Sequence, residues 1–126
     1  MAIKVLLADD ALMMRQMIRV LIQQHSDLEL VGEAGNFGQA MRMASDLKPD
    51  VVLLDLHMPG GIDAVPADVR SRLEVSGSKV VAISIWNDED SLALAKEFGA
   101  VKLLNKMELG GLLVPTILHV ALADAL

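Results

Sequence analysis

Acidic, hydroxyl and basic residues follow apolar runs at several points of the chain. Two aspartates, Asp9 and Asp10, come directly after the first run, and Asp55 follows a later one. Ser84 ends a third apolar run and Lys106 follows a fourth. Carboxylates that converge in space repel one another, so ionising all of them is costly unless a cation binds between them. Mg²⁺ suits such oxygen donors, because it needs only one or two carboxylates besides water and phosphate.

The same residues could support phosphoryl transfer. A carboxylate such as that of Asp55 can attack phosphorus and form an aspartyl phosphate. Lys106 as a point charge and Ser84 as a hydroxyl donor would then hold the phosphoryl oxygens, because this chemistry depends largely on positioning and electrostatic stabilisation. Taken singly, Asp10 could be a helix N-cap, Asp55 a turn residue and Lys106 a solvated charge. Their joint occurrence after four apolar runs favours the functional interpretation.

The apolar runs have the composition of buried β-strands. They are rich in Val, Ile and Leu with little alternation, which is typical of strands covered on both faces of a parallel sheet. We predict such strands over residues 3–8, 51–54, 80–84 and 101–104. A fifth strand, over residues 29–34, contains Gly32 and is placed at an edge of the sheet.

Between the strands, apolar residues recur with the spacing of helices. The predicted buried stripes are Met14, Met17, Ile18, Leu21 and Ile22 in the first helix, Phe37, Ala40, Met41, Ala44 and Leu47 in the second, and Val114, Ile117, Leu118, Ala121 and Leu122 in the last. Pro49 ends the second helix near Lys48. Pro115 fits only in the first turn of the last helix, so Gly110 and Gly111 are assigned to the segment before it.

Two further helices complete an alternating α/β series. One spans roughly residues 63–75. The other is capped by Asn87 and has three acidic residues in its first turn: Asp88, Glu89 and Asp90. It runs to Phe98 and ends at Gly99. Five strands and five helices then build a parallel sheet with right-handed crossovers and helices on both faces. Such a doubly wound sheet binds ligands outside the carboxyl ends of its strands, which is where the polar residues gather.

Composition restricts what else the chain could do. Its 126 residues fit one domain, its formal net charge of −6 gives no basic surface for direct nucleic-acid binding, and no membrane span or export signal is visible. The chain has no cysteine, which rules out disulfides and thiol chemistry and makes a cytoplasmic location the default expectation.

The whole chain, residues 1–126, resembles the receiver domain of two-component response regulators. The segments that carry the resemblance are residues 5–10, residues 49–60, residues 80–84, and Gly99-Ala100 leading to Lys106. Residues 13–19 of the first helix look most like the NarL/FixJ subfamily, whose receivers usually precede a helix-turn-helix output domain. The resemblance implies a flavodoxin-like five-stranded sheet in the order 2-1-3-4-5.

The resemblance also implies a role for each site residue. Asp55 would accept a phosphoryl group from a sensor histidine kinase, a phosphotransfer protein or a small phosphodonor. Mg²⁺ would be held by Asp10, Asp55 and the backbone carbonyl of His57, with Asp9 acting mainly through a water. Ser84 and Lys106 would contact the phosphoryl oxygens. The domain would be a phosphoprotein switch that assists its own phosphorylation and dephosphorylation, and not an enzyme with a separate substrate.

Several positions depart from the family pattern. Leu103 occupies the switch position on the last strand, where relatives carry an aromatic residue that repacks when the residue at Ser84 moves inward. The loop over residues 58–64 has one residue more than is common and ends in Ala64, where glycine is frequent. Met107 replaces a frequent proline, so we expect a trans bond or visible strain there.

His57 and Trp86 occupy positions that, in the family, line the route of hydrolytic water. Two bulky groups there would slow dephosphorylation. For Trp86, packing or contact with a partner is the alternative interpretation.

Other functions stay open from the sequence. A receiver-like interaction module that works without phosphate is one, and Leu103 favours it slightly. A Mg²⁺-dependent phosphatase with an aspartate nucleophile is another, although it needs an acidic residue where the chain has His57.

Exposed apolar groups near Leu92, Leu94, Leu103 and Leu104 could form a homodimer or output face. The chain ends just after the predicted last helix, so we expect either a single-domain regulator or the receiver of a longer protein.

Overall fold

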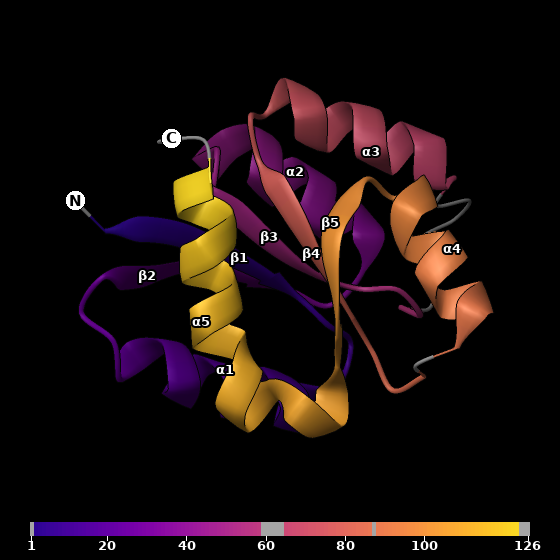
Figure 1. Cartoon of the computed structure of the whole chain (residues 1–126). Helices are drawn as coiled ribbons and strands as arrows, with labels where there is room; N and C mark the ends of the chain where they lie inside the picture. Colours follow the sequence, from indigo (N-terminus) through magenta and orange to yellow (C-terminus); the bar gives the residue numbers. More distant parts are fainter. Residues whose placement is uncertain (1, 59–64, 87, 124–126) are drawn as a thin grey trace.

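Five parallel strands form one open sheet in the computed structural model, which describes residues 2–58, 65–86 and 88–123 (Figure 1). The strands are β1 (Ile3–Ala8), β2 (Leu28–Ala34), β3 (Val51–Asp55), β4 (Lys79–Ser84) and β5 (Ala100–Asn105). Their order is β2-β1-β3-β4-β5, and every neighbouring pair is parallel. The predicted flavodoxin-like order is therefore confirmed, as is the edge position of the strand that contains Gly32.

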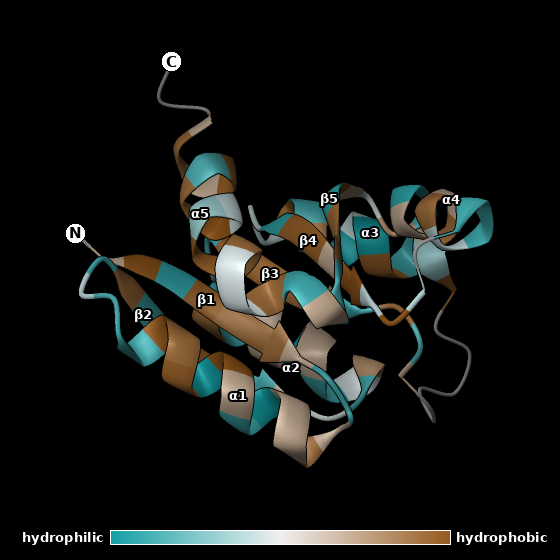
Figure 2. Ribbon diagram, turned by 60° about the horizontal axis from the view of Figure 1, so that its bottom comes forward, coloured by the Kyte–Doolittle hydropathy of each residue, from teal (hydrophilic) through white to brown (hydrophobic). Residues whose placement is uncertain are grey.

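Helices cover both faces of the sheet. They are α1 (Leu12–Gln23), α2 (Phe37–Leu47), α3 (Pro66–Val75), α4 (Glu89–Glu97) and α5 (Leu109–Leu122), with a short 3-10 turn, η1 (Lys106–Glu108), before α5. Side chains of α1 and α5 share one buried cluster, and side chains of α2, α3 and α4 share the other. The two groups of helices lie on opposite sides of the strands (Figures 1 and 2).

The central strands are apolar on both faces because both faces are covered. In β3, Val51 and Leu53 pack under α1 and α5, whereas Val52 and Leu54 pack under α2 to α4, and all four are fully buried. Full burial of one such side chain contributes roughly 1.5–3 kcal/mol. The near absence of polar alternation in the sequence thus follows from the two-sided packing.

Gly32 has a packing role in β2. Val5 pairs with Leu30 and Leu6 pairs with Gly32, so Val31 is an extra residue in the β1–β2 ladder. A Cβ at position 32 would lie 2.6 Å from the terminal methyl carbon of Met43 on α2. The glycine therefore lets α2 approach this edge of the sheet closely.

The prediction for the last helix is wrong at its beginning. α5 begins at Leu109, so Gly110 and Gly111 are helical and Pro115 lies in the interior. Leu109 and Leu113 are both fully buried, and their contacts with the core hold the first turns in place. Tertiary packing thus overrides the low helix propensity of two glycines and a proline.

The buried stripes are also partly wrong. In α1 only Ile18 and Ile22 are buried, and Met17 is exposed. α5 buries Leu109, Leu113, Ile117 and Val120, whereas Leu122 is exposed. In α2 four of the five predicted residues are buried and Leu47 is exposed. The spacing of the sequence is compatible with more than one apolar face in α1 and α5, because both helices are apolar over much of their circumference.

The remaining boundaries differ in detail. α2 ends as predicted, with Lys48 in the left-handed region at φ 48° before Pro49. Asp88 is the N-cap of α4 and accepts a hydrogen bond from the Ser91 N–H, whereas the predicted cap, Asn87, lies outside the described residues. α3 begins at Pro66; Asp63 and the loop from residue 59 to Ala64 also lie outside them.

Candidate functional site

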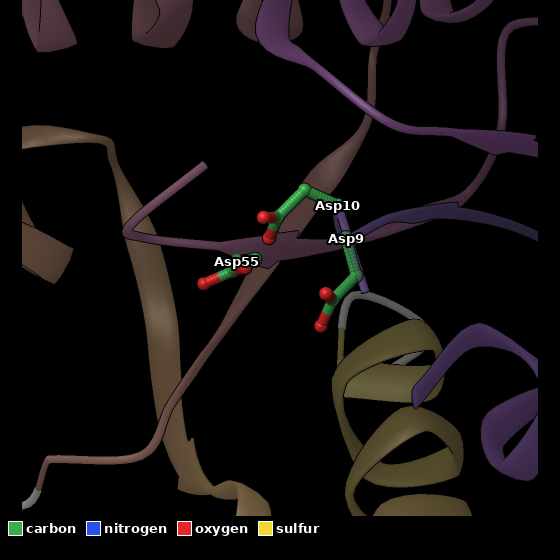
Figure 3. A group of neighbouring side chains, drawn as sticks. All are labelled: Asp9, Asp10 and Asp55. Carbon is green, nitrogen blue, oxygen red and sulfur yellow. The ribbon is translucent and has the colours of Figure 1, made fainter. Parts of the chain in front are cut away.

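The strand order brings the predicted site residues to one edge of the sheet. Asp9 and Asp10 follow β1, Asp55 ends β3 and Ser84 ends β4. Lys106 comes directly after β5. Since β1, β3, β4 and β5 are consecutive neighbours in the sheet, their carboxyl ends meet there. Figure 3 shows the three aspartates as neighbours at this edge.

Asp9 is fully buried and its carboxylate is held in place. Oδ1 accepts a hydrogen bond from the backbone N–H of Ala11 at 2.8 Å. Among the described residues, Oδ2 has no hydrogen-bond partner of good geometry, although Nζ of Lys106 lies 2.8 Å away as an ion pair. A buried carboxylate oxygen in this condition is suited to a cation.

Asp10 is exposed and does not cap α1, whose N-cap is Ala11. The capping interpretation weighed for Asp10 is therefore wrong. Its carboxylate lies close enough to those of Asp9 and Asp55 that one oxygen from each falls within 4.8 Å of the others. The exposed position leaves Asp10 open to solvent and to an incoming ligand.

Asp55 is buried, and its two carboxylate oxygens differ in their surroundings. Oδ1 accepts a hydrogen bond from the His57 N–H at 3.1 Å, and Oδ2 accepts one from Lys106 Nζ at 3.3 Å. Burial raises the pKa of Asp55 to about 6, and the His57 N–H and the Lys106 charge only partly oppose this, while Asp9 and Asp10 add to it.

Lys106 joins two of the carboxylates. Its side chain is only 10% exposed, and Nζ contacts both Asp9 and Asp55. Burial disfavours the ammonium, but the carboxylates of Asp9 and Asp55 outweigh it and raise the pKa of Lys106. The surface-charge interpretation of this lysine is therefore wrong.

Ser84 and Trp86 are connected through the backbone. Ser84 is fully buried, and its Oγ accepts a hydrogen bond from the Trp86 N–H at 3.0 Å. The Trp86 side chain is exposed, as is His57. Hydrogen bonds from Ser91 lower the pKa of Asp88, the N-cap of α4 in the loop after β4.

Leu103 makes an aliphatic contact with the core, and the peptide bond before Met107 is trans. Leu103 is half-buried and packs against the cluster under α2 to α4. Within the described residues every peptide bond is trans, which agrees with the expectation for Met107. An aliphatic side chain therefore stands at the predicted switch position, in contact with the core.

Arg15 is a site residue that the sequence did not indicate. Its Nη1 donates to the backbone carbonyl of Asp9 at 2.6 Å, and its Nε lies 3.4 Å from Glu33. Arg19, one turn later, donates two hydrogen bonds to the same glutamate at 2.6 and 2.9 Å. The pairing depends on the placement of α1 beside β2, which no short motif encodes.

The residues fit a divalent cation such as Mg²⁺. Asp9, Asp10 and Asp55 supply only oxygen donors, and one oxygen from each lies within 4.8 Å of the others. When all are ionised, the three carboxylates and the Lys106 ammonium leave two negative charges, which a divalent ion would neutralise. The predicted contribution of the His57 carbonyl stays a prediction.

The model of the response regulator receiver domain family matches residues 5–115. The chain belongs to this family. The receiver is 35% identical over 104 residues to the transcriptional regulatory protein LiaR of Bacillus subtilis, covering 82% of this chain and 49% of that protein. It is 38% identical over 96 residues to the nitrate/nitrite response regulator NarL of Escherichia coli, covering 76% of this chain and 44% of that protein.

Solved structures support the same assignment. The signal receiver domain of a NarL response regulator from Mycobacterium tuberculosis matches with a TM-score of 0.84 and 28% identity, over 95% of this chain and 96% of that one. The response regulator domain of Thermotoga maritima CheB matches with a TM-score of 0.81 and 25% identity, over 96% and 97%. The receiver is NarL-like, and it spans about half the length of the curated relatives it matches. Among the described residues, no helix is long and apolar enough to cross a membrane.

Proposed function

We propose that residues 1–126 form one receiver that takes a phosphoryl group on Asp55 in a Mg²⁺-dependent reaction and thereby changes a partner or output surface. The observation that carries the proposal is the meeting of Asp9, Asp10, Asp55 and Lys106 at the carboxyl edge of the sheet. A sensor histidine kinase or a phosphotransfer protein is the proposed donor, in the cytoplasm that the cysteine-free composition favours.

The chemical step is a transfer from nitrogen to oxygen. An oxygen of the Asp55 carboxylate attacks phosphorus of a phosphohistidine, a P–O bond forms and the P–N bond breaks. The leaving electron pair stays on the imidazole nitrogen, which takes a proton from water. Oδ2 faces Lys106, so that ammonium stands where it can hold a phosphoryl oxygen. The His57 N–H keeps Oδ1 in a fixed position during the attack.

The carboxylates of Asp9, Asp10 and Asp55 would hold the metal ion, with Asp9 acting mainly through a water. When bound, Mg²⁺ supplies positive charge that stabilises the transferring phosphoryl oxygens. Arg15 supports this arrangement as a positioning residue, since it fixes the backbone carbonyl of Asp9.

The switch would begin at Ser84. Its hydroxyl is buried and accepts from the Trp86 N–H, so a move toward a phosphoryl oxygen on Asp55 would disturb the loop that leads into α4. Leu103 cannot donate a hydrogen bond or present a ring, so any change on β5 has to proceed by aliphatic repacking. The receiver thus acts as a signalling switch and not as an enzyme with its own substrate.

Intact mass spectrometry after incubation with acetyl phosphate tests the proposal. We expect a phosphoryl adduct with Mg²⁺, none after chelation, and none in Asp55→Asn with Mg²⁺. Lys96→Met on the exposed side of α4 serves as a control that should be labelled like the unmodified chain.

The two alternative functions predict different outcomes. A receiver-like module that works without phosphate would give no adduct with acetyl phosphate or with a kinase, and its partner binding would not respond to phosphodonor. An aspartate-nucleophile phosphatase would turn over many equivalents of a free phosphate ester. His57 stands where that phosphatase needs an acid, so we expect no such turnover.

A further inference from the structure

Asp9 is held from three directions just beyond the end of β1. Its N–H donates to the carbonyl of Ala34 at 3.0 Å. Its carbonyl accepts from Nη1 of Arg15 at 2.6 Å, and its carboxylate accepts from the Ala11 N–H at 2.8 Å. A buried carbonyl that has left the sheet needs such a partner. The peptide unit between Asp9 and Asp10 is therefore oriented by an arginine side chain.

Asp10 depends on this peptide unit more than the other two aspartates do. Asp9 and Asp55 are buried, and each carboxylate accepts a hydrogen bond from the backbone N–H two residues later. Asp10 is exposed and lies between the end of β1 and the start of α1. One of its carboxylate oxygens still lies within 4.8 Å of oxygens of the other two. The direction of its side chain is therefore set mainly by the backbone before it, which Arg15 holds.

Arg15 is itself anchored by an acidic residue on β2. Its Nε lies 3.4 Å from Oε1 of Glu33, and the two side chains are only 20% and 22% exposed. A partly buried guanidinium with several donors can serve two acceptors at once. Glu33 thus supplies the counter-charge that keeps the guanidinium in one place while Nη1 bonds the Asp9 carbonyl.

Arg19 shares the same glutamate but does not reach the site. It donates to both carboxylate oxygens of Glu33, at 2.6 and 2.9 Å. Within the described ranges, its side-chain hydrogen bonds go to Glu33 and not to Asp9. Two arginines of one helix therefore pair with one glutamate, and of these two it is Arg15 that contacts an aspartate of the site.

We propose that Arg15, anchored by Glu33, is a positioning residue that sets the Mg²⁺ affinity of the receiver by aiming the carboxylate of Asp10. The inference rests on the metal site of the proposed function. Residues that hold metal ligands in place commonly change metal affinity about 10–100-fold when they are replaced. By linkage, whatever the contact of α1 with β2 adds to binding of the ion, the bound ion adds to the stability of that contact.

The sign of the effect separates positioning from charge. Arg15 carries a positive charge next to the aspartates, so removal of that charge alone would strengthen the binding of a cation. Positioning predicts the opposite, because a carboxylate of Asp10 that is no longer aimed contributes less to binding. A weaker affinity after loss of Arg15 therefore cannot come from its charge.

Titration with MgCl₂ at constant ionic strength, followed through the amide resonances of the ¹⁵N-labelled protein, measures the dissociation constant. We expect Arg15→Met to raise it about tenfold. Arg19→Met is the matched control, because it removes the same charge and an ion pair with the same glutamate but leaves Arg15 on Asp9. It should leave the constant unchanged or slightly lower. An unchanged constant in Arg15→Met, or an equal increase in both variants, would overturn the proposal.

A double-mutant cycle tests the anchor. Glu33→Gln removes a negative charge and so weakens cation binding in any background, but this contribution cancels in the cycle. We expect Glu33→Gln to raise the dissociation constant more in the unmodified receiver than in Arg15→Met, where the anchor has no guanidinium to hold. Equal increases in the two backgrounds would contradict the role of Glu33 as the anchor of Arg15.

The carbonyl ¹³C resonance of Asp9 reports the contact without any metal ion. A carbonyl carbon moves upfield when its hydrogen bond is lost, so Arg15→Met should shift this resonance and Arg19→Met should not. Both variants lose an ion pair with Glu33, so a general loss of stability would act on both. The same shift in both variants would therefore contradict a specific contact of Arg15 with the site.

The labelling of Asp55 by acetyl phosphate distinguishes failure of this inference from failure of the proposed function. If the unmodified receiver is labelled and Arg15→Met binds Mg²⁺ equally well, the inference alone is wrong. If Arg15→Met binds Mg²⁺ more weakly and Asp55 is never labelled, the positioning role stands and the phosphoryl transfer is wrong. An unmodified receiver that binds no Mg²⁺ up to about 100 mM would overturn both.

Discussion

In the absence of a metal ion, Lys106 supplies the positive charge that stabilises the site. It contacts two buried carboxylates, those of Asp9 and Asp55, which would otherwise face each other without a counter-charge. Removing one partner of a buried ion pair leaves an uncompensated charge, which costs more than the pair contributes.

Lys106→Met should therefore lower the free energy of unfolding without Mg²⁺ by about 3 kcal/mol. Urea denaturation measures it, with Lys96→Met on the exposed side of α4 as the control. Adding Asp55→Asn to Lys106→Met should recover part of the loss. Equal stability of Lys106→Met and the unmodified protein would mean that the ion pairs contribute little.

The backbone N–H and the indole side chain of Trp86 can be tested separately. Its N–H holds Ser84 Oγ, whereas its indole is exposed to solvent. Trp86→Ala removes the indole and keeps the N–H. If the indole hinders hydrolytic water, the aspartyl phosphate of Trp86→Ala will decay several-fold faster, as followed by loss of the mass adduct. Leu92→Ala on α4 is the control, and an unchanged lifetime in Trp86→Ala would leave the indole with a packing or partner role.

At the residue scale the sequence was informative because the site is made from strand ends. Asp9, Asp55 and Ser84 each follow an apolar run, and a parallel sheet brings such positions to one edge. Arg15 was not predictable, because its contact with Asp9 depends on how α1 turns relative to β2. The burial of Lys106 likewise comes from neighbours that are far away in the sequence.

At the scale of elements, the glycines of α5 and the glycine before β5 differ in backbone conformation and in the space available for a Cβ. Gly110 is helical, and a Cβ there would meet no atom within 4 Å, whereas Gly99 has φ +81° and a Cβ there would lie 2.8 Å from Arg70 Cγ. Gly110→Ala should therefore stabilise the protein by about 0.5–1 kcal/mol, since alanine has the higher helix propensity. Gly99→Ala should destabilise it. Thermal unfolding at one protein concentration compares them, and destabilisation by Gly110→Ala would mean that its surface is covered.

The contact between α1 and β2 should be sensitive to acid. Hydrogen bonds from Arg19 lower the pKa of Glu33, and burial opposes them only partly. The contribution to stability is therefore complete above the ordinary glutamate pKa, about 4.3, and is lost as pH falls through the lower folded value. Its size is at most about 1 kcal/mol, because Arg19 is partly exposed.

Glu33→Gln should accordingly flatten the loss of stability below about pH 4.3, measured by urea denaturation at several pH values. Glu74→Gln is the matched control, because Glu74 pairs with Arg70 on the surface of α3. Parallel acid profiles for Glu33→Gln and the unmodified protein would show that this ion pair does not affect folding.

Helix patterns were the less predictable part of the fold. The strands are short and buried on both faces, so their apolar runs were diagnostic. In α5 the apolar residues surround the helix, and periodicity alone could not decide which of them face the core. Pro115 was expected to mark the first turn, but the core contacts of Leu109 and Leu113 begin the helix earlier.

At the scale of the whole molecule, ligand binding and folding should be linked. A cation that binds the three aspartates in the folded chain stabilises it by mass action, about 2.7 kcal/mol at a concentration one hundred times its dissociation constant. The unfolding temperature should thus rise with Mg²⁺ and return after chelation. Asp10→Asn removes an exposed ligand and should reduce the rise. An equal rise in Asp10→Asn would place the ion elsewhere.

The two sides of the sheet divide the molecule into distinct surfaces. α2, α3 and α4 expose charged side chains, whereas the residues of α1 and α5 that are fully exposed carry no formal charge and the arginines of α1 pair with Glu33. The polar site lies at the edge between them, at the carboxyl ends of the strands.

The tryptophan beside Ser84 also makes the molecule its own optical reporter. The chain contains one tryptophan and no tyrosine, so its ultraviolet emission comes almost entirely from one place. That indole is half open to solvent and belongs to the residue whose N–H bonds the site hydroxyl. If an ion binds at this edge or the serine moves, we expect the fluorescence to change, with no dye attached and no residue replaced.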